Sequence, residues 1–346
     1  MSSVSADLPV AEGTGSVSGV PELPPGFTDT FTSHYVEAGD IRMHAVIGGE
    51  GPPLLLVHGW PESWYSWRHQ LDPLVAAGFR VAAMDVRGYG GSDKPDAIEA
   101  YDMISLTDDV AGVIDSLAGS EPAILVGHDW GAPIVWTTSI RHSKRVRAVI
   151  GLSVPHLGRG KQSALDVYKH LYQNKFFYQI YFQTPGVAEA ELEADLHKTI
   201  RLTYFNASGA SDVPRFDKKP DAKFLDGMVD PDPLPAWLTQ EDLSYYVSQF
   251  ERSGFRGPLN RYRNQQRDFE LLPELSERKI EQPALFIAGE RDPVLRFMPG
   301  VNLLDVMDKW YGDLRGKVLI PGAGHWVQQE KPQETTDAML RFLRNL

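Results

Sequence analysis

Cysteine is absent from this chain of 346 residues, and its absence excludes several kinds of chemistry at once. Without cysteine there is no disulfide, no thiolate nucleophile and no cysteine-ligated zinc site. Positive charge is also scarce, because 34 Lys and Arg residues stand against 46 Asp and Glu residues and leave a net charge of −12. A surface of that sign repels phosphate backbones, so nucleic acid is not an expected partner.

Long hydrophobic runs are missing as well. No apolar stretch approaches the roughly 20 residues that a membrane span needs. The N-terminus has no basic segment followed by an apolar stretch, so we expect no signal peptide. Hydrophobic residues make up 42% and charged residues 23%, which is the composition of an ordinary globular domain. The expectation is a cytoplasmic protein with a sizeable core and no membrane partner.

Short apolar runs alternate with longer amphipathic segments through most of the chain. The runs have the composition of buried strands and lie at residues 53–57, 80–84, 123–126, 146–152, 284–288 and 317–320. Segments of helix length lie between them, near residues 64–76, 103–117 and 130–142. Continuous apolar strands joined by helices are typical of a parallel sheet that is covered on both faces. The predicted class is therefore α/β.

The alternation stops between about residues 156 and 277. This segment is rich in aromatic and charged residues and has a mostly helical pattern. We interpret it as a lid inserted into an α/β core that comprises residues 28–155 and 278–346. Residues 1–27 are rich in Ser, Gly and Pro without a hydrophobic period, and they are predicted to form a flexible N-terminal arm.

The most informative string is Gly127-His-Asp129-Trp-Gly131, which follows a predicted strand and precedes a predicted helix. It has the form of a nucleophile elbow, in which glycines allow a tight turn between strand and helix. Serine esterases carry Ser at the central position, so Asp129 excludes that activity. An aspartate is already ionised at neutral pH and can displace a leaving group at an sp³ carbon, which forms an alkyl ester on the enzyme. The alternative is an Asp that only caps the helix.

Hydrolysis of such an ester requires a base and a partner acid. His325 lies in the Gly-rich string after the last predicted strand, and we predict that it is the base. The acid is expected after the strand at 284–288, where Asp292 is the candidate and Glu290 its rival. The chain order of nucleophile, acid and histidine fits this assignment. No spacing of His with carboxylates suggests a metal site, so neither a metal nor a cofactor is expected.

A tetrahedral intermediate needs hydrogen-bond donors for its oxyanion. The string His58-Gly59-Trp60-Pro61 directly follows the first predicted strand. Glycine lets the backbone turn back over the elbow, and proline fixes the exit through a cis bond. We therefore expect the backbone N–H groups of Trp60 and Trp130 to face the oxyanion, and the other three residues of the string to shape the loop.

Together these strings resemble the epoxide hydrolases of the α/β-hydrolase fold, over nearly the whole chain after residue 28. The motifs that carry the resemblance are Gly-His-Asp-Trp-Gly, His-Gly-Trp-Pro, Gly-His-Trp and, at residues 85–92, Asp-x-Arg-Gly-x-Gly-x-Ser. The chain is most similar to the soluble-type group, through the strings at 61–68, 177–186 and 254–264. The resemblance implies a mostly parallel sheet flanked by helices, with an inserted helical lid.

The resemblance also assigns roles to lid residues. In that family one tyrosine from each lid string hydrogen-bonds the epoxide oxygen, and by position these are Tyr178 and Tyr262. A phenol of pKa ~10 stays protonated at neutral pH and can protonate the leaving alkoxide. The family's usual Trp before the second tyrosine is Arg261 here, which alters the pocket rim. Three further residues are expected to contact the substrate: Phe176, Gln179 and Pro133.

The implied activity is hydrolysis of an apolar epoxide to a vicinal diol through an ester on Asp129. The expected partners are the epoxide and water, and a homodimer is the candidate assembly.

Other activities of the same fold fit less well. A haloalkane dehalogenase shares the acidic nucleophile and its partners, but the Asn usual after Gly59 is missing. A fluoroacetate dehalogenase has arginines where this chain has Trp130 and Pro133. A non-catalytic receptor typically loses a triad member, and all three are in place here.

Overall fold

A single twisted sheet forms the centre of the protein. The computed structural model describes residues 8–13, 15–20, 23–24, 26–212 and 218–346. The strands are β1 (Phe31–Ala38), β2 (Ile41–Gly48), β3 (Pro53–Val57), β4 (Arg80–Met84), β5 (Ala123–His128), β6 (Val146–Leu152), β7 (Ile280–Gly289) and β8 (Tyr311–Ile320). Their order in the sheet is β1-β2-β4-β3-β5-β6-β7-β8. β2 runs antiparallel to β1 and β4, and all other neighbours are parallel, which confirms the predicted α/β class.

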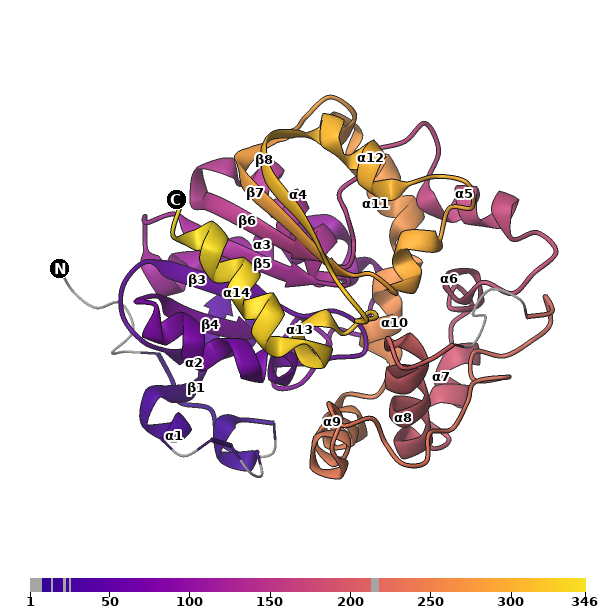
Figure 1. Cartoon of the computed structure of the whole chain (residues 1–346), viewed down its shortest axis with the longest axis horizontal. Coiled ribbons are helices and arrows are strands. Elements are labelled where there is room, and N and C mark those ends of the chain that lie inside the picture. Colours follow the sequence, from indigo (N-terminus) through magenta and orange to yellow (C-terminus); the bar gives the residue numbers. More distant parts are fainter. Residues whose placement is uncertain (1–7, 14, 21–22, 25, 213–217) are drawn as a thin grey trace.

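Helices cover both faces of this sheet (Figure 1). α3 (Met103–Ala118) and α4 (Gly131–Arg141) pack together on one face, and α2 (Arg68–Ala76) and α14 (Pro332–Leu343) pack together on the other. The shorter helices of this part are α1 (Phe27–Thr30), α12 (Leu303–Met307) and α13 (Val327–Glu330). Short 3-10 helices lie at Val17–Gly19, Trp64–Trp67, Ile98–Tyr101, Ser143–Arg145, Pro273–Ser276, Pro293–Arg296 and Asp308–Trp310. Within the described ranges, no helix has both the length and the hydropathy that crossing a membrane requires.

Two strands at one edge of the sheet, β1 and β2, escape the search for apolar runs. β1 alternates buried and less buried residues, so it contains no continuous apolar segment. β2 is buried except at Arg42, but Arg42 and His44 interrupt its apolar residues. β8 has the same problem, because as an edge strand it exposes polar residues along most of its length, and the pattern detects only its last residues. By contrast, every residue of β3 and β5 is buried. A strand that is buried on both faces is mostly apolar, so it can be recognised in the sequence as an apolar run.

Helices α5 to α11 follow β6 and precede β7, and Figure 1 shows them gathered beyond the ends of the strands. They are α5 (Ala164–Leu171), α6 (Tyr178–Tyr181), α7 (Val187–Leu192), α8 (Leu196–Ala207), α9 (Gln240–Ser253), α10 (Arg256–Arg263) and α11 (Gln265–Leu271). A buried ion pair ties them to the sheet, since Arg68 Nε of α2 lies 3.2 Å from Asp242 Oδ1 of α9. Tyr65 donates its hydroxyl hydrogen to the same carboxylate at 2.9 Å.

Described residues of the N-terminal segment contact both the sheet and the helices α5 to α11. The Val17 N–H donates to Ser33 Oγ of β1 at 2.8 Å. The Gly15 carbonyl oxygen accepts from Trp64 Nε1 at 2.9 Å and from the Tyr245 hydroxyl of α9 at 3.1 Å. Gly15 and Val17 therefore lie against the protein. Residues 1–7, 14, 21–22 and 25 of the predicted N-terminal arm lie outside the described residues, and the flexibility of the arm stays a prediction.

A buried aspartate after β4 joins three segments below the elbow. Asp85 accepts hydrogen bonds from Trp64 N at 2.9 Å, from Gly91 N at 2.9 Å and from His44 Nδ1 at 2.8 Å. Burial raises the pKa of Asp85, but the hydrogen bond and charge of His44 outweigh it and hold that pKa at about 2. The Asp85 carboxylate is therefore ionised, and its hydrogen bonds hold these three segments together.

We expect Asp85→Asn to lower the free energy of unfolding by about 3–5 kcal/mol at pH 7, because an amide cannot accept from three donors at once. The pKa of about 2 in the folded protein lies below the ordinary value of 3.8. The carboxylate's contribution is therefore complete at neutral pH and is lost as the pH falls through about 2. Urea denaturation at pH 7 measures the change.

Asp93→Asn is the matched control, since Asp93 lies in the same loop but its side chain is 40% exposed. Its ion pair with Arg42 is solvated and should contribute little. Equal losses of stability in the two variants would contradict the structural assignment of Asp85.

Candidate active site

β5 and α4 meet at Asp129 in a turn that only glycine can flank. Asp129 has a φ of 50°, in the left-handed region that side chains rarely adopt. A Cβ at Gly127 would lie 2.2 Å from the Gly131 carbonyl oxygen, and one at Gly131 would lie 2.0 Å from the Val57 carbonyl oxygen. The turn therefore has the strained geometry that the G-x-D-x-G pattern predicts.

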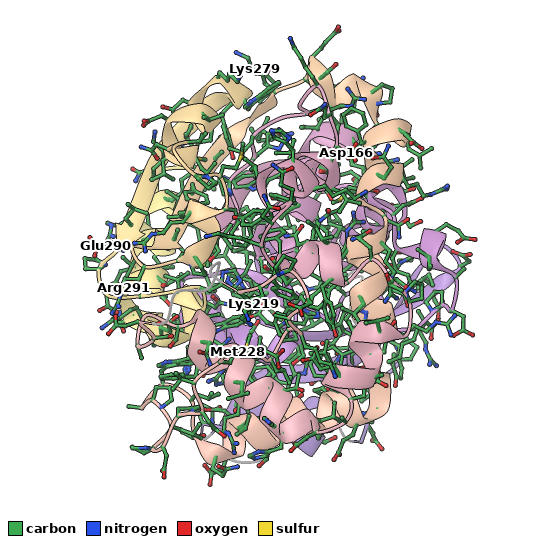
Figure 2. All side chains as sticks on the ribbon, turned by 90° about the vertical axis from the view of Figure 1, so that its right-hand side faces the viewer. Asp166, Lys219, Met228, Lys279, Glu290 and Arg291 are labelled. Carbon is green, nitrogen blue, oxygen red and sulfur yellow. The ribbon has the colours of Figure 1, made fainter. Side chains whose placement is uncertain are left out.

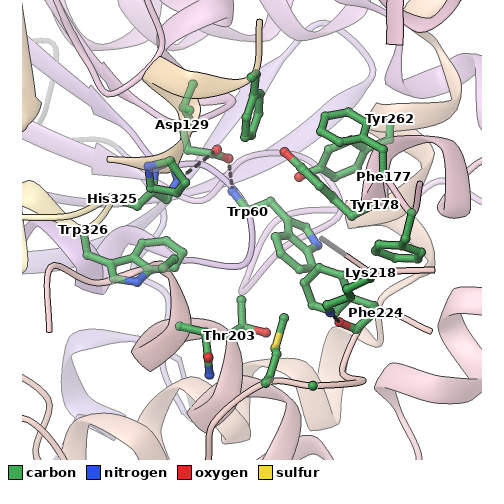
Figure 3. Close-up of a pocket in the computed structure, with 18 residues that line it drawn as sticks. Trp60, Asp129, Phe177, Tyr178, Thr203, Lys218, Phe224, Tyr262, His325 and Trp326 are labelled. Atoms are coloured by element: carbon green, nitrogen blue, oxygen red, sulfur yellow. Dashed lines mark hydrogen bonds and ion pairs between the residues drawn. The ribbon is translucent and has the colours of Figure 1, made fainter. Parts of the chain in front are cut away.

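Three residues from separate loops meet beside this turn. His325 Nε2 lies 3.1 Å from Asp129 Oδ2 (Figure 3), and His325 Nδ1 lies 3.1 Å from Asp292 Oδ1. Asp292 is completely buried, and Oδ1 also accepts from Val294 N at 2.9 Å. The rival carboxylate, Glu290, is exposed at the margin of the molecule (Figure 2). The fold thus places Asp292, and not Glu290, against the histidine.

The loop after β3 brings a backbone donor to the nucleophile. Trp60 N donates to Asp129 Oδ1 at 2.8 Å (Figure 3). This N–H contacts the carboxylate directly, and its role as an oxyanion donor stays a prediction. The second expected donor, the Trp130 N–H, follows Asp129 directly and stays a prediction.

The other residues of that loop hold its shape. A Cβ at Gly59 would lie 2.4 Å from Asp129 Cβ, so only glycine permits this close approach. The peptide bond before Pro61 is cis. His58 Nε2 accepts from Val86 N at 3.0 Å, which fastens the loop to the segment after β4.

A second histidine and a carboxylate lie beneath the nucleophile, and the sequence argument assigns them no role. His128 Nδ1 lies 2.8 Å from Glu62 Oε2, and its Nε2 lies 2.7 Å from the His325 carbonyl oxygen. Glu62 Oε2 also accepts from Gly59 N at 2.9 Å. Nε2 of His128 therefore donates to a carbonyl oxygen, which only accepts, and Nδ1 faces the Glu62 carboxylate. In the sequence, only their positions point to these two residues: Glu62 directly follows His58-Gly-Trp-Pro61, and His128 directly precedes Asp129.

Charge is balanced across the buried triad. Burial raises the pKa of Asp129, but the hydrogen bond and charge of His325 outweigh it and lower that pKa below its ordinary value. Burial lowers the pKa of His325, but the charge of Asp292 and hydrogen bonds to both carboxylates outweigh it and raise that pKa to about 10. At neutral pH the histidine is therefore an imidazolium between two carboxylates, and Asp129 is ionised.

Two phenols from the helices between β6 and β7 face Asp129. Tyr178 begins α6 and Tyr262 lies in α10, and their ring centroids are 5.8 Å apart. Figure 3 shows both phenol oxygens directed toward Asp129. The pKa of both phenols lies well above the ordinary value. Burial is the largest cause, and the negative charge of Asp129 raises the pKa further. Both therefore stay protonated at neutral pH and are able to donate.

Two cavities meet at the nucleophile, one of about 110 Å³ and one of about 330 Å³. Four residues line both of them: Asp129, Tyr178, Val294 and Phe297. Of the residues expected to contact substrate, Phe176 lines the smaller cavity, whereas Gln179 and Pro133 line the larger one. Several residues of the smaller cavity carry no signal in the sequence: Thr203, Asn206, Lys218, Phe224 and Met228.

Arg261 is part of the larger cavity's wall and is not confined to a pocket rim. Its guanidinium is buried, forms an ion pair with Asp268 and donates to the Tyr101 carbonyl oxygen at 2.5 Å. The same group lies 4.7 Å from the Trp130 ring centroid. Burial lowers the pKa of Arg261 to about 9, so it remains charged at neutral pH.

Comparison with known proteins agrees with this geometry. A protein family with the description "alpha/beta hydrolase fold" matches residues 52–332 of this chain. Epoxide hydrolase A of Mycobacterium tuberculosis is 44% identical over 321 residues, which are 91% of this chain and 98% of that protein. Bifunctional epoxide hydrolase 2 of Rattus norvegicus is 39% identical over 306 residues, which are 88% of this chain and 54% of the rat protein. The crystal structure of epoxide hydrolase A from Mycobacterium thermoresistibile is 45% identical, with a TM-score of 0.85 over 92% of this chain and 99% of that one. The chain therefore belongs to the α/β-hydrolase fold family and, within it, to the epoxide hydrolases.

Proposed function

We propose that this epoxide hydrolase works in two steps through a covalent ester on Asp129. The observation that carries the proposal is one ionised carboxylate that contacts a backbone donor and an imidazolium and shares its cavity with two phenols. A nucleophile, an oxyanion donor, a base and proton donors are the groups that this reaction requires.

In the first step Asp129 Oδ2 attacks one carbon of the epoxide. The bond between that carbon and the ring oxygen breaks, and its electron pair stays on the oxygen. Tyr178 or Tyr262 gives the oxygen a proton, and the resulting phenolate recovers a proton from solvent. Oδ1 becomes the carbonyl oxygen of the ester and keeps its hydrogen bond from Trp60 N.

In the second step water attacks the ester carbonyl carbon. His325, after its imidazolium has released a proton to solvent, takes a proton from that water through Nε2, while Asp292 holds the ring through Nδ1. The bond between the carbonyl carbon and the alkyl oxygen then breaks, His325 returns the proton to that oxygen, and the diol leaves. The carboxyl group left on Asp129 gives its proton to His325, which restores the ionised carboxylate and the imidazolium. Formation of the ester removes the negative charge of Asp129, which is one of the causes that raise the pKa of His325. The first step therefore converts an imidazolium into a better base for the second.

Aromatic side chains define the substrate class that we propose. The smaller cavity is lined by Trp60, Phe176, Phe224 and other apolar groups. Such a lining favours an apolar epoxide, because burying apolar surface is worth roughly 25 cal/mol per Å².

The arrangement also supports a division of the chain. We propose that residues 156–277 form the lid and that residues 28–155 and 278–346 form the core. Both phenols come from the former segment, and all members of the triad come from the latter.

The two-step proposal predicts that His325→Gln accumulates the ester. Asp129 needs no base to attack, so mixing this variant with styrene oxide should give a protein heavier by the mass of the epoxide, with the added mass on the peptide that contains Asp129. Intact-protein and peptide mass spectrometry measure this. His170→Gln, an exposed change of the same kind, should show no adduct. An adduct that persists when Asp129→Ala is added to His325→Gln would place the nucleophile elsewhere.

Removal of either phenol should slow ester formation. We expect Tyr178→Phe and Tyr262→Phe each to lower the single-turnover rate by roughly 10- to 10²-fold, and the double variant by roughly 10²- to 10⁴-fold. Rapid mixing with enzyme in excess measures the rate. Tyr181→Phe is the control, because this hydroxyl donates to Glu191 and not into the cavity. Normal ester formation in the double variant would exclude the phenols as proton donors.

Ester hydrolysis should become faster as the pH rises, because His325 must lose its proton to act as a base. The midpoint should lie below the pKa of about 10 that His325 has beside an ionised Asp129. Single-turnover decay of the ester at a series of pH values gives this midpoint. A rate that is independent of pH, or that falls as pH rises through the neutral range, would contradict His325 as the base.

A further inference from the structure

A chain of two amides ends on one of the phenols. Gln265 Nε2 of α11 donates to Gln179 Oε1 of α6 at 2.5 Å, and Gln179 Nε2 donates to the Tyr178 hydroxyl oxygen at 2.9 Å. The two glutamine residues are only 9% and 6% exposed, so water does not compete freely for these bonds. All three side chains line the larger cavity together with Asp129.

These two successive hydrogen bonds run in one direction, from Gln265 through Gln179 to Tyr178. An amide has a donor end and an acceptor end, and Gln265 occupies the acceptor end of Gln179. The donor end of Gln179 is therefore the one that faces Tyr178. A phenol oxygen that accepts a hydrogen bond still holds one proton of its own, and that proton must point away from the donor.

We propose that Gln179 is a positioning residue that directs the proton of Tyr178 toward the epoxide oxygen, and that Gln265 sets the orientation of the Gln179 amide. This inference rests on the proposed function, in which Tyr178 protonates the opening epoxide. It gives Gln179 a role different from the substrate contact expected from the sequence. Gln179 acts through the phenol and needs no contact with the substrate.

Two further observations support this arrangement. Gln183 Nε2 donates to the backbone carbonyl of Gln179 at 2.7 Å and to that of Tyr262 at 3.0 Å, so the segments that carry both phenols are held in one register. Burial raises the pKa of Tyr178, and the hydrogen bond from Gln179 opposes that rise. A bond that stabilises the phenolate makes the phenol a better proton donor.

A double-mutant cycle separates positioning from a structural role. Gln179→Met removes the donor with little change in size and should slow single-turnover ester formation about tenfold, as the loss of one hydrogen bond does. In a Tyr178→Phe background the same change should have no further effect, because the group on which it acts is gone. Gln173→Met, an exposed change in the same segment, is the control and should leave the rate unchanged. Equal losses from Gln179→Met in both backgrounds would overturn the proposal.

A change of polarity gives a second test. Gln179→Glu keeps the size and shape of the side chain, but the carboxylate only accepts and should draw the phenol proton away from the substrate. Ester formation should therefore be slower than in Gln179→Met, and it should recover as the pH is lowered and the new carboxyl group gains a proton to donate. A merely structural role predicts the opposite order, and normal ester formation in Gln179→Glu would overturn the proposal.

The role of Gln265 is tested in the same way. Gln265→Met should slow ester formation less than Gln179→Met, because it frees the amide of Gln179 to turn without removing it. Gln266→Met is the matched control, since this neighbour donates to Glu270 on the surface. A full rate in Gln265→Met would remove Gln265 from the proposal.

Failure of this inference is distinguishable from failure of the proposed function. If Tyr178→Phe slows ester formation and Gln179→Met does not, only the positioning role is wrong. If Tyr178→Phe itself has no effect, Tyr178 is not a required proton donor, and its proposed role fails together with the positioning role of Gln179, while the ester on Asp129 is still tested by the adduct in His325→Gln.

Discussion

One buried ionised carboxylate constrains the rest of the active site. Burial alone would raise the pKa of Asp129 and favour the neutral acid, which is a poor nucleophile. The imidazolium of His325 and the backbone N–H of Trp60 offset that cost from two directions. Trp60 and Asp129 follow the adjacent parallel strands β3 and β5, so their loops reach the same edge of the sheet. The strand order is therefore what makes a buried aspartate chemically useful.

Beneath Asp129, two further buried carboxylates also contact histidine side chains. Glu62 is paired with His128, and Asp85 is paired with His44, each in a buried site and each across different loops. Removing a carboxylate from water is costly, and hydrogen bonds from a histidine ring and from backbone N–H groups offset that cost. These loops are thus joined by buried hydrogen bonds as well as by packing.

Burial has opposite consequences for the two kinds of reacting group. At Asp129 it disfavours the form that reacts, and neighbouring charge must overcome it. At Tyr178 and Tyr262 it favours the protonated form, which is the form that donates. In the proposed mechanism one cavity therefore serves an anionic nucleophile and neutral acids together, because the carboxylate is paired and the phenols are not charged.

The sequence by itself determined the features that depend on a few consecutive residues. The turn at Asp129 needs only a strand, two glycines and a helix, and the central strands are recognisable because burial on both faces makes them continuously apolar. The edge strands β1 and β8 fit that rule poorly, because only four of the eight residues of β1 and two of the ten residues of β8 are buried.

Tertiary structure alone decided the choices between side chains. Asp292 and Glu290 are two positions apart, and only the packing of the loop buries the first against His325 and leaves the second in solvent. Gln265 and Gln179 are 86 positions apart, and they meet because helices α6 and α11 place their amides together beside Tyr178. Local patterns encode the backbone path over a few residues, whereas the partner of a buried polar side chain is set by whichever distant element packs against it.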